Sequence, residues 1–166
     1  MDSPVTARIV AFLREIGLEV REGRIEGRTF VPGIQIRHGG LVYDPTGPFH
    51  PGDLLHEAGH LAIVPPARRA AMHIDAGKRA GEEMTAIAWS YAAAVHLGID
   101  AAVVFHDDGY KGGGASLAEN FRNGQYVGVP VLAWLGLTTE SRRATELGRP
   151  PYPHMRAWLV DAGPAG

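Results

Sequence analysis

The sequence predicts an α+β fold in which a small, mainly antiparallel sheet packs on a HExxH-bearing helix and a second, glutamate-bearing helix. Three observations lead to this prediction. Apolar residues near the N-terminus recur at helical spacing, glycine-punctuated β-prone pieces fill residues 18–49, and two apolar helical segments follow at 54–63 and 82–97. The 166 residues, 45% of them hydrophobic, are enough for one core, so residues 1–166 are assigned to a single domain.

The first elements are predicted from their end signals. Ser3 and Pro4 form an N-cap and first-turn pair, and Gly17 is a typical stop for the helix between them. The β-prone segments that follow are 29–31, 34–37 and 41–43. His38, Gly39 and Gly40 separate the last two segments and indicate a hairpin turn.

Two further helices are predicted from their caps and stops. Asp53 is a suitable N-cap for a helix that runs to about Ile63, where two prolines end it. A strong helical segment extends from Glu82 to Leu97, with Gly98 as its stop. Beyond it, the pattern predicts a short helix at 100–105, a loop at 106–115, a helix at 116–122, an apolar segment at 129–135 and a late anchor at 158–160.

Composition excludes several classes of function. A net charge of -2 without a run of like charges is not typical of nucleic-acid binding. The absence of cysteine excludes disulfides and thiolate metal sites. No segment has the length of a membrane span, and the N-terminus lacks the pattern of a secretory signal. We therefore expect a cytoplasmic protein with neither nucleic-acid nor membrane partners.

The central motif is His56-Glu57-Ala58-Gly59-His60. On a helix, positions i and i+4 share one face, so both imidazoles can bind one zinc ion. Glu57 lies roughly 100° around the helix from His56, where its carboxylate can act as general base on a water molecule. The neighbours of the motif are apolar, which predicts a buried helix in which a metal offsets the desolvation of the polar groups.

The third ligand must come from elsewhere in the chain, because a catalytic zinc site takes about three protein ligands. Glu82 and Glu83 begin a helix about twenty residues downstream. Glu83 shares a helical face with small and apolar residues suited to packing on the motif helix. We therefore favour Glu83 as the ligand, with Glu82 as the alternative.

The HExxH motif, followed by the helix that starts Glu83-Met84-Thr85-Ala86, resembles the gluzincins, most closely the ImmA/IrrE family of metallopeptidases. The resemblance covers about residues 40–97. It implies that His56, His60 and Glu83 bind zinc, that Glu57 is the general base, and that the substrate is a peptide or protein. The family usually has Asp or Asn after the alanine, whereas Ile87 stands here.

Loop residues are candidates for stabilising the oxyanion of a hydrolysis reaction. His106, Tyr110 and Tyr126 lie in or beside glycine-rich loops. The predicted function is thus zinc-dependent hydrolysis of a peptide bond, with Glu57, His106 and Tyr126 as catalytic residues. Two alternatives stay open: a metal-binding regulatory or interaction module without turnover, and a metal-free site with structural histidines.

Overall fold

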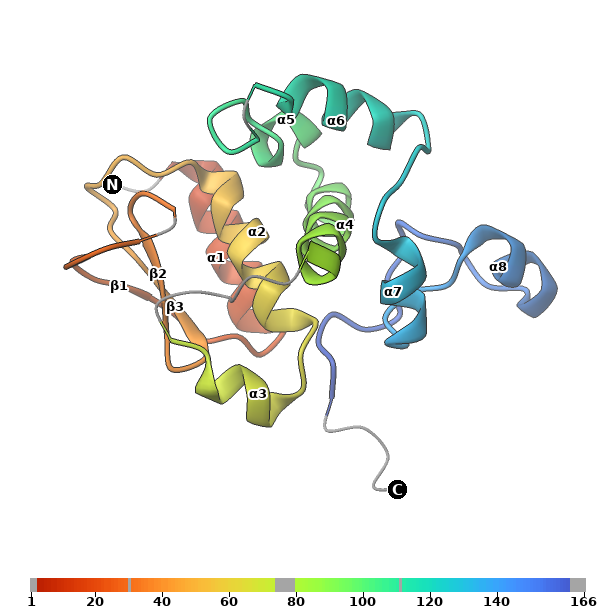
Figure 1. Cartoon of the computed structure of the whole chain (residues 1–166), viewed down its shortest axis with the longest axis horizontal. Coiled ribbons are helices and arrows are strands. Elements are labelled where there is room, and N and C mark those ends of the chain that lie inside the picture. The colour runs from red at the N-terminus through yellow and green to blue at the C-terminus, as the bar shows by residue number, and fades with distance from the viewer. Residues whose placement is uncertain (1–2, 30, 74–79, 111, 162–166) are drawn as a thin grey trace.

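The predicted α+β class is confirmed by the computed structural model, which describes residues 3–29, 31–73, 80–110 and 112–161. Within these ranges the chain forms a three-stranded sheet and eight helices (Figure 1). The strands are β1 (Val20–Glu22), β2 (Ile34–Arg37) and β3 (Gly40–Tyr43). The helices are α1 (Pro4–Glu15), α2 (Pro51–Ala62), α3 (Pro66–Ala71), α4 (Ala80–Leu97), α5 (Ala101–Val104), α6 (Gly114–Arg122), α7 (Val129–Trp134) and α8 (Ser141–Leu147).

The sheet is mixed, with strand order β1-β3-β2. β2 and β3 form the predicted antiparallel hairpin, and His38 and Gly39 at its turn have φ values of 48° and 82°. Two successive positive φ angles match a hairpin turn of type I′. β1 adds to the other edge of β3 in parallel, a strand that the sequence pattern did not predict. The strand predicted at 29–31 is wrong: Val31 makes a single bridge to Ile34, and Phe30 lies outside the described residues.

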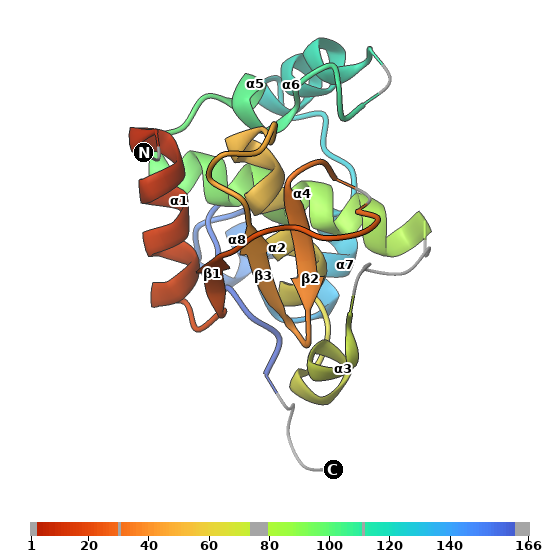
Figure 2. The same ribbon diagram turned by 90° about the vertical axis from the view of Figure 1, so that its left-hand side faces the viewer.

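α2 is the centre of the molecule. One side of this helix contacts the sheet and α1, and the other side contacts α4 (Figure 2). Because it is covered on both sides, its apolar residues are fully buried, and they include Leu54, Leu55, Ala58 and Leu61. The histidines and Glu57 of the motif are therefore carried by a rigid, packed helix.

Helices α2 and α6 begin earlier than predicted, and the sequence pattern missed helix α8. α2 begins at Pro51 rather than after Asp53, because Pro51 occupies its first turn and His50 precedes it as the cap residue. Asp53 is consequently free to pair with another side chain. α6 begins at Gly114, ahead of the predicted start at residue 116. α8 was not predicted, since its sequence is mostly polar and only Ala144 is buried.

The C-terminal segment returns to the core. The ring of Trp158 packs edge-on against that of Phe12, with 5.0 Å between the ring centroids. The backbone carbonyl oxygen of Trp158 accepts a hydrogen bond from Trp89 Nε1 at 2.9 Å. The predicted late anchor is thus confirmed. Among the described residues, no helix has both the length and the apolar character needed to cross a membrane.

Candidate metal centre

The contact between α2 and α4 positions the candidate site. Gly59 lies against the α4 backbone: a Cβ placed on it would be 2.8 Å from the carbonyl oxygen of Ala86. Any larger residue would therefore push the helices apart. This close approach brings the first turn of α4, which contains Glu83, over the face of α2 that carries His56 and His60.

Glu83 bridges the two histidines of the motif. Its Oε1 lies 3.0 Å from His56 Nε2, and its Oε2 lies 2.9 Å from His60 Nε2. The two Nε2 atoms are 3.3 Å apart. The side chains of His56 and His60 are 13% and 7% exposed, whereas that of Glu83 is 49% exposed. Two imidazole nitrogens and one carboxylate therefore converge on one point. The half-exposed side chain of Glu83 is the side of this point that faces solvent.

The spacing of the two histidine nitrogens fits a tetrahedral zinc ion, whereas the Glu83 oxygens, 3.0 and 2.9 Å from them, stand at hydrogen-bond distance and would move slightly outward to join the ion. Two nitrogens at about 2.0–2.1 Å from such an ion lie roughly 3.3–3.4 Å apart, since the edge of a tetrahedron is about 1.6 times its centre-to-corner distance. The observed separation of the Nε2 atoms is 3.3 Å. Two imidazoles and one carboxylate are also the ligand types found in catalytic zinc sites.

The electrostatics of the site follow from burial and from these short contacts. Hydrogen bonds from His56 and His60 hold the pKa of Glu83 well below its usual range, despite partial burial. Burial lowers the pKa of His56, but the hydrogen bond to Glu83 and the charges of nearby carboxylates outweigh it, so the net shift is upward. The site thus concentrates negative charge where a cation would bind.

Glu57 occupies a different position from Glu83. One of its carboxylate oxygens comes within 4.8 Å of ring nitrogens of His56 and His60. Burial raises the pKa of Glu57, and the adjacent histidines oppose this shift only in part. A carboxylate with a raised pKa, close to the donors but farther than Glu83, is suited to taking and returning a proton.

Glu82 points away from the two histidines. Its carboxylate forms a two-pronged ion pair with Arg68 of α3, in which Oε2 lies 3.0 Å from Nη2. The orientations of Glu82 and Glu83 agree with the helical-face argument from the sequence. The role of Glu83 as a ligand stays a prediction.

Tyr110 is the loop residue that touches the site. Its hydroxyl lies 3.3 Å from His56 Nδ1, the ring nitrogen opposite the one facing Glu83. Burial raises the pKa of Tyr110, and nearby carboxylates raise it further, so the phenol is neutral. It can accept a hydrogen bond from Nδ1, which leaves Nε2 of His56 free to bind a metal.

The other two predicted catalytic residues lie in different surroundings. The ring of Tyr126 packs in an aromatic cluster formed by Tyr91, Phe121 and Tyr152. His106 pairs with Asp53 of α2, with 2.6 Å between Nε2 and Oδ1. The contact with Asp53 could not be predicted while that residue was interpreted as a helix cap.

Comparison with known protein families, with curated proteins and with solved structures finds no match to this chain.

Proposed function

We propose that this chain is a zinc-dependent hydrolase that cleaves a peptide bond, with His56, His60 and Glu83 as metal ligands and Glu57 as general base. The observation that supports it most directly is the convergence of two imidazoles and one carboxylate within 3.3 Å of each other, with a second carboxylate beside them. The gluzincin resemblance, of the ImmA/IrrE type, and a cytoplasmic location belong to the same proposal.

The residues divide the chemistry between them. A zinc ion bound at this site would supply Lewis-acid polarisation of the scissile carbonyl and activation of water. Glu57 would remove a proton from that water and return it to the leaving amine. Tyr110 would hold the ring of His56 through Nδ1.

The exposed side chain of Glu83 marks the side from which a substrate would reach the site. The side chains of the two histidines are nearly buried, and that of Glu83 is half exposed. A peptide or protein substrate, as yet unidentified, would enter from this side. Nothing in the described geometry requires a nucleic acid or a membrane.

The experiment combines metal analysis with a cleavage assay. Protein purified without chelator or affinity-tag metal should retain about one tightly bound zinc ion per chain. Incubation with a mixed peptide library, followed by mass spectrometry, should reveal cleavage products. Glu57→Gln should keep the zinc and abolish cleavage, whereas His56→Ala should lose the zinc.

Two results would overturn this assignment. Loss of zinc in Glu57→Gln as complete as in His56→Ala would make Glu57 a ligand rather than a base. Wild-type protein that binds zinc but cleaves no peptide would favour the alternative, a metal-binding regulatory or interaction module.

A further inference from the structure

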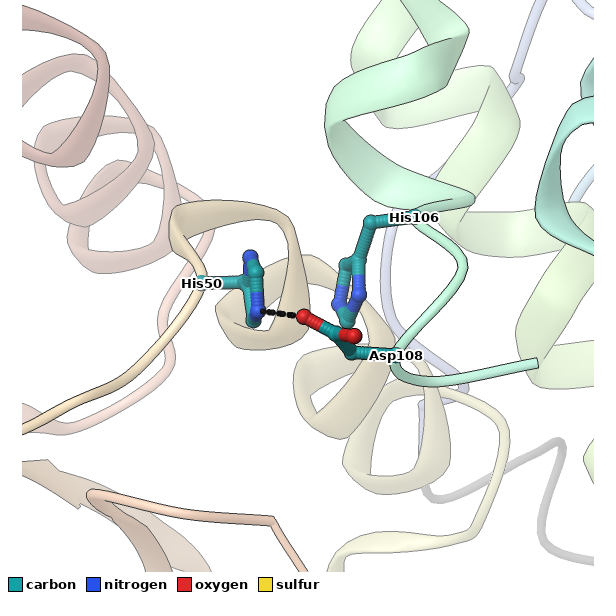
Figure 3. Close-up of side chains that lie close together, drawn as sticks. All are labelled: His50, His106 and Asp108. Atoms are coloured by element: carbon teal, nitrogen blue, oxygen red, sulfur yellow. Dashed lines mark hydrogen bonds and ion pairs between the residues drawn. The ribbon is translucent and has the colours of Figure 1, made fainter. Parts of the chain in front are cut away.

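A second group of potential metal ligands lies at the start of α2. It consists of His50, which precedes α2, and of His106 and Asp108, which follow α5. One ligand atom from each residue lies within 4.8 Å of the other two. His50 Nε2 is 2.9 Å from Asp108 Oδ2, and the rings of His50 and His106 stack with 3.8 Å between their centroids. Because the lone pair of an imidazole lies in its ring plane, the exposed His50 ring must turn out of this stack before both histidines can bind one ion. Figure 3 shows the three side chains gathered together, with one carboxylate oxygen of Asp108 directed at the His50 ring.

The hydrogen bonds of His106 favour a metal-binding tautomer. Its Nε2 lies 2.6 Å from Oδ1 of the buried Asp53, so this nitrogen donates its proton to the carboxylate. The backbone N–H of Gly109 points at Nδ1 at 3.2 Å, so Nδ1 carries a lone pair. The same N–H also contacts the carbonyl oxygen of His106 at 3.3 Å, and it keeps that partner if a metal takes Nδ1.

A histidine held by a carboxylate through one nitrogen is a recurrent support for metal ligands, because the carboxylate fixes the tautomer and makes the other nitrogen more basic. Asp53 supplies this support from within α2. The side chains of Asp53 and His106 are 11% and 13% exposed, so their pairing is a built feature of the fold rather than a surface contact.

We propose that His50, His106 and Asp108 form a second metal site, separate from the His56 centre, for a divalent transition cation of the zinc type. Two imidazoles and one carboxylate suit zinc and its neighbours rather than Mg²⁺ or Ca²⁺, which prefer oxygen ligands. His50 and Asp108 are 46% and 79% exposed, so water completes the coordination and the ion binds more weakly than at the buried centre.

An ion at this site would also act on the first centre. It would join the loop that carries Asp108 to the start of α2. Tyr110 belongs to the same loop and contacts His56 Nδ1. Binding at the second site would therefore hold Tyr110 in place against the first.

The test uses a protein in which the first centre is removed. His56→Ala/His60→Ala should still bind about one equivalent of Zn²⁺ by isothermal titration, and no Mg²⁺. Adding Asp108→Asn or His50→Gln should weaken the remaining Zn²⁺ binding by at least about tenfold. The matched control is His38→Gln/His73→Gln, which removes another stacked pair of exposed histidines, 4.2 Å between centroids, and should leave binding unchanged.

The proposal is overturned if the double variant binds no Zn²⁺. It is also overturned if His38→Gln/His73→Gln abolishes the binding of Zn²⁺ by the double variant while Asp108→Asn leaves it unchanged. If the double variant does not fold, the titration is made on protein that keeps His56 and His60. In that protein Asp108→Asn should reduce the number of bound Zn²⁺ ions per chain from two to one. An unchanged number overturns the proposal. Failure of peptide cleavage does not bear on this site, because its readout is binding alone.

Discussion

Gly59 of α2 and Ala86 of α4 touch through their backbones, so closely that a Cβ on Gly59 would lie 2.8 Å from the carbonyl oxygen of Ala86 and 3.2 Å from its Cα. Ala86 is nearly one helical turn beyond Glu83. The contact therefore sets how far the Glu83 carboxylate stands from His56 and His60. The glycine in the motif is thus required by packing.

We expect Gly59→Ala to destabilise the protein and to weaken zinc binding. Overpacking in a core costs about 1–3 kcal/mol. Alanine regains about 1 kcal/mol of helix propensity, so the net loss should be up to about 2 kcal/mol. The measurements are the free energy of unfolding in denaturant and the zinc dissociation constant.

The matched control for this prediction is Gly81→Ala in the first turn of α4. A Cβ at Gly81 meets nothing within 4 Å, so this change should be neutral or stabilising by up to about 1 kcal/mol. Equal effects of the two substitutions would show that the crossing of α2 and α4 is not tight at Gly59.

Glu83→Gln and Glu82→Gln should separate the two carboxylates at the start of α4. Glu83→Gln removes a metal ligand and should therefore weaken zinc binding by more than about 100-fold. Loss of a residue that only supports a ligand weakens metal binding by about 10–100-fold. Glu82→Gln should leave zinc affinity unchanged. It removes a partly exposed ion pair with Arg68, which is worth about 0.2–1 kcal/mol of stability. The reverse pattern of zinc affinities would transfer the ligand role to Glu82.

Metal removal should lower the thermal stability. An ion that binds only the folded chain stabilises it by about 2.7 kcal/mol when present at 100 times its dissociation constant. For a chain of this size, that corresponds to a rise in Tm of about 5–11 °C. Asp108→Asn protein is the suitable sample, since the first centre alone then contributes. Chelator should reverse the rise, and zinc should not raise the Tm of a variant that also carries His60→Ala.

Local signals explain what the sequence could predict. The cap at Ser3, the stop at Gly98 and the hairpin turn at His38 and Gly39 depend on neighbouring residues, and the structure confirms them. The orientation of Glu83 followed from helical periodicity, because residues three apart in α4 share the face that meets α2. A motif on one helix and a periodic pattern on the next were thus enough to predict this part of the arrangement.

Features that depend on distant segments could not be predicted. β1 has only one buried residue, and it forms because β3 offers a free edge: Leu41 N–H donates to the Glu19 carbonyl at 2.8 Å. The pairing of Asp53 with His106 joins positions 53 residues apart. Likewise, no local pattern distinguishes Tyr110, which contacts His56, from Tyr126, which packs among other tyrosines.

The last prediction separates these two tyrosines. Tyr110→Phe removes the hydroxyl that lies 3.3 Å from His56 Nδ1 while keeping the ring that packs against Phe105. Without that acceptor the imidazole loses its orientation and the preference for a lone pair on Nε2. Zinc should then bind about 10–100-fold more weakly, with its stoichiometry at the first centre unchanged.

Tyr126→Phe is the control, since that ring stands 4.6 Å from Tyr152, and the rings of Phe121 and Phe105 lie between it and Tyr110. It should preserve both zinc affinity and peptide cleavage, although the sequence alone made Tyr126 a candidate catalytic residue. Competition titration against a zinc-binding dye gives the affinities, and the library assay gives the cleavage rates. The contrary result is that Tyr126→Phe abolishes cleavage while Tyr110→Phe leaves both zinc affinity and cleavage rate unchanged. That result would assign the catalytic role to Tyr126 and would show that the contact of Tyr110 with His56 has no function.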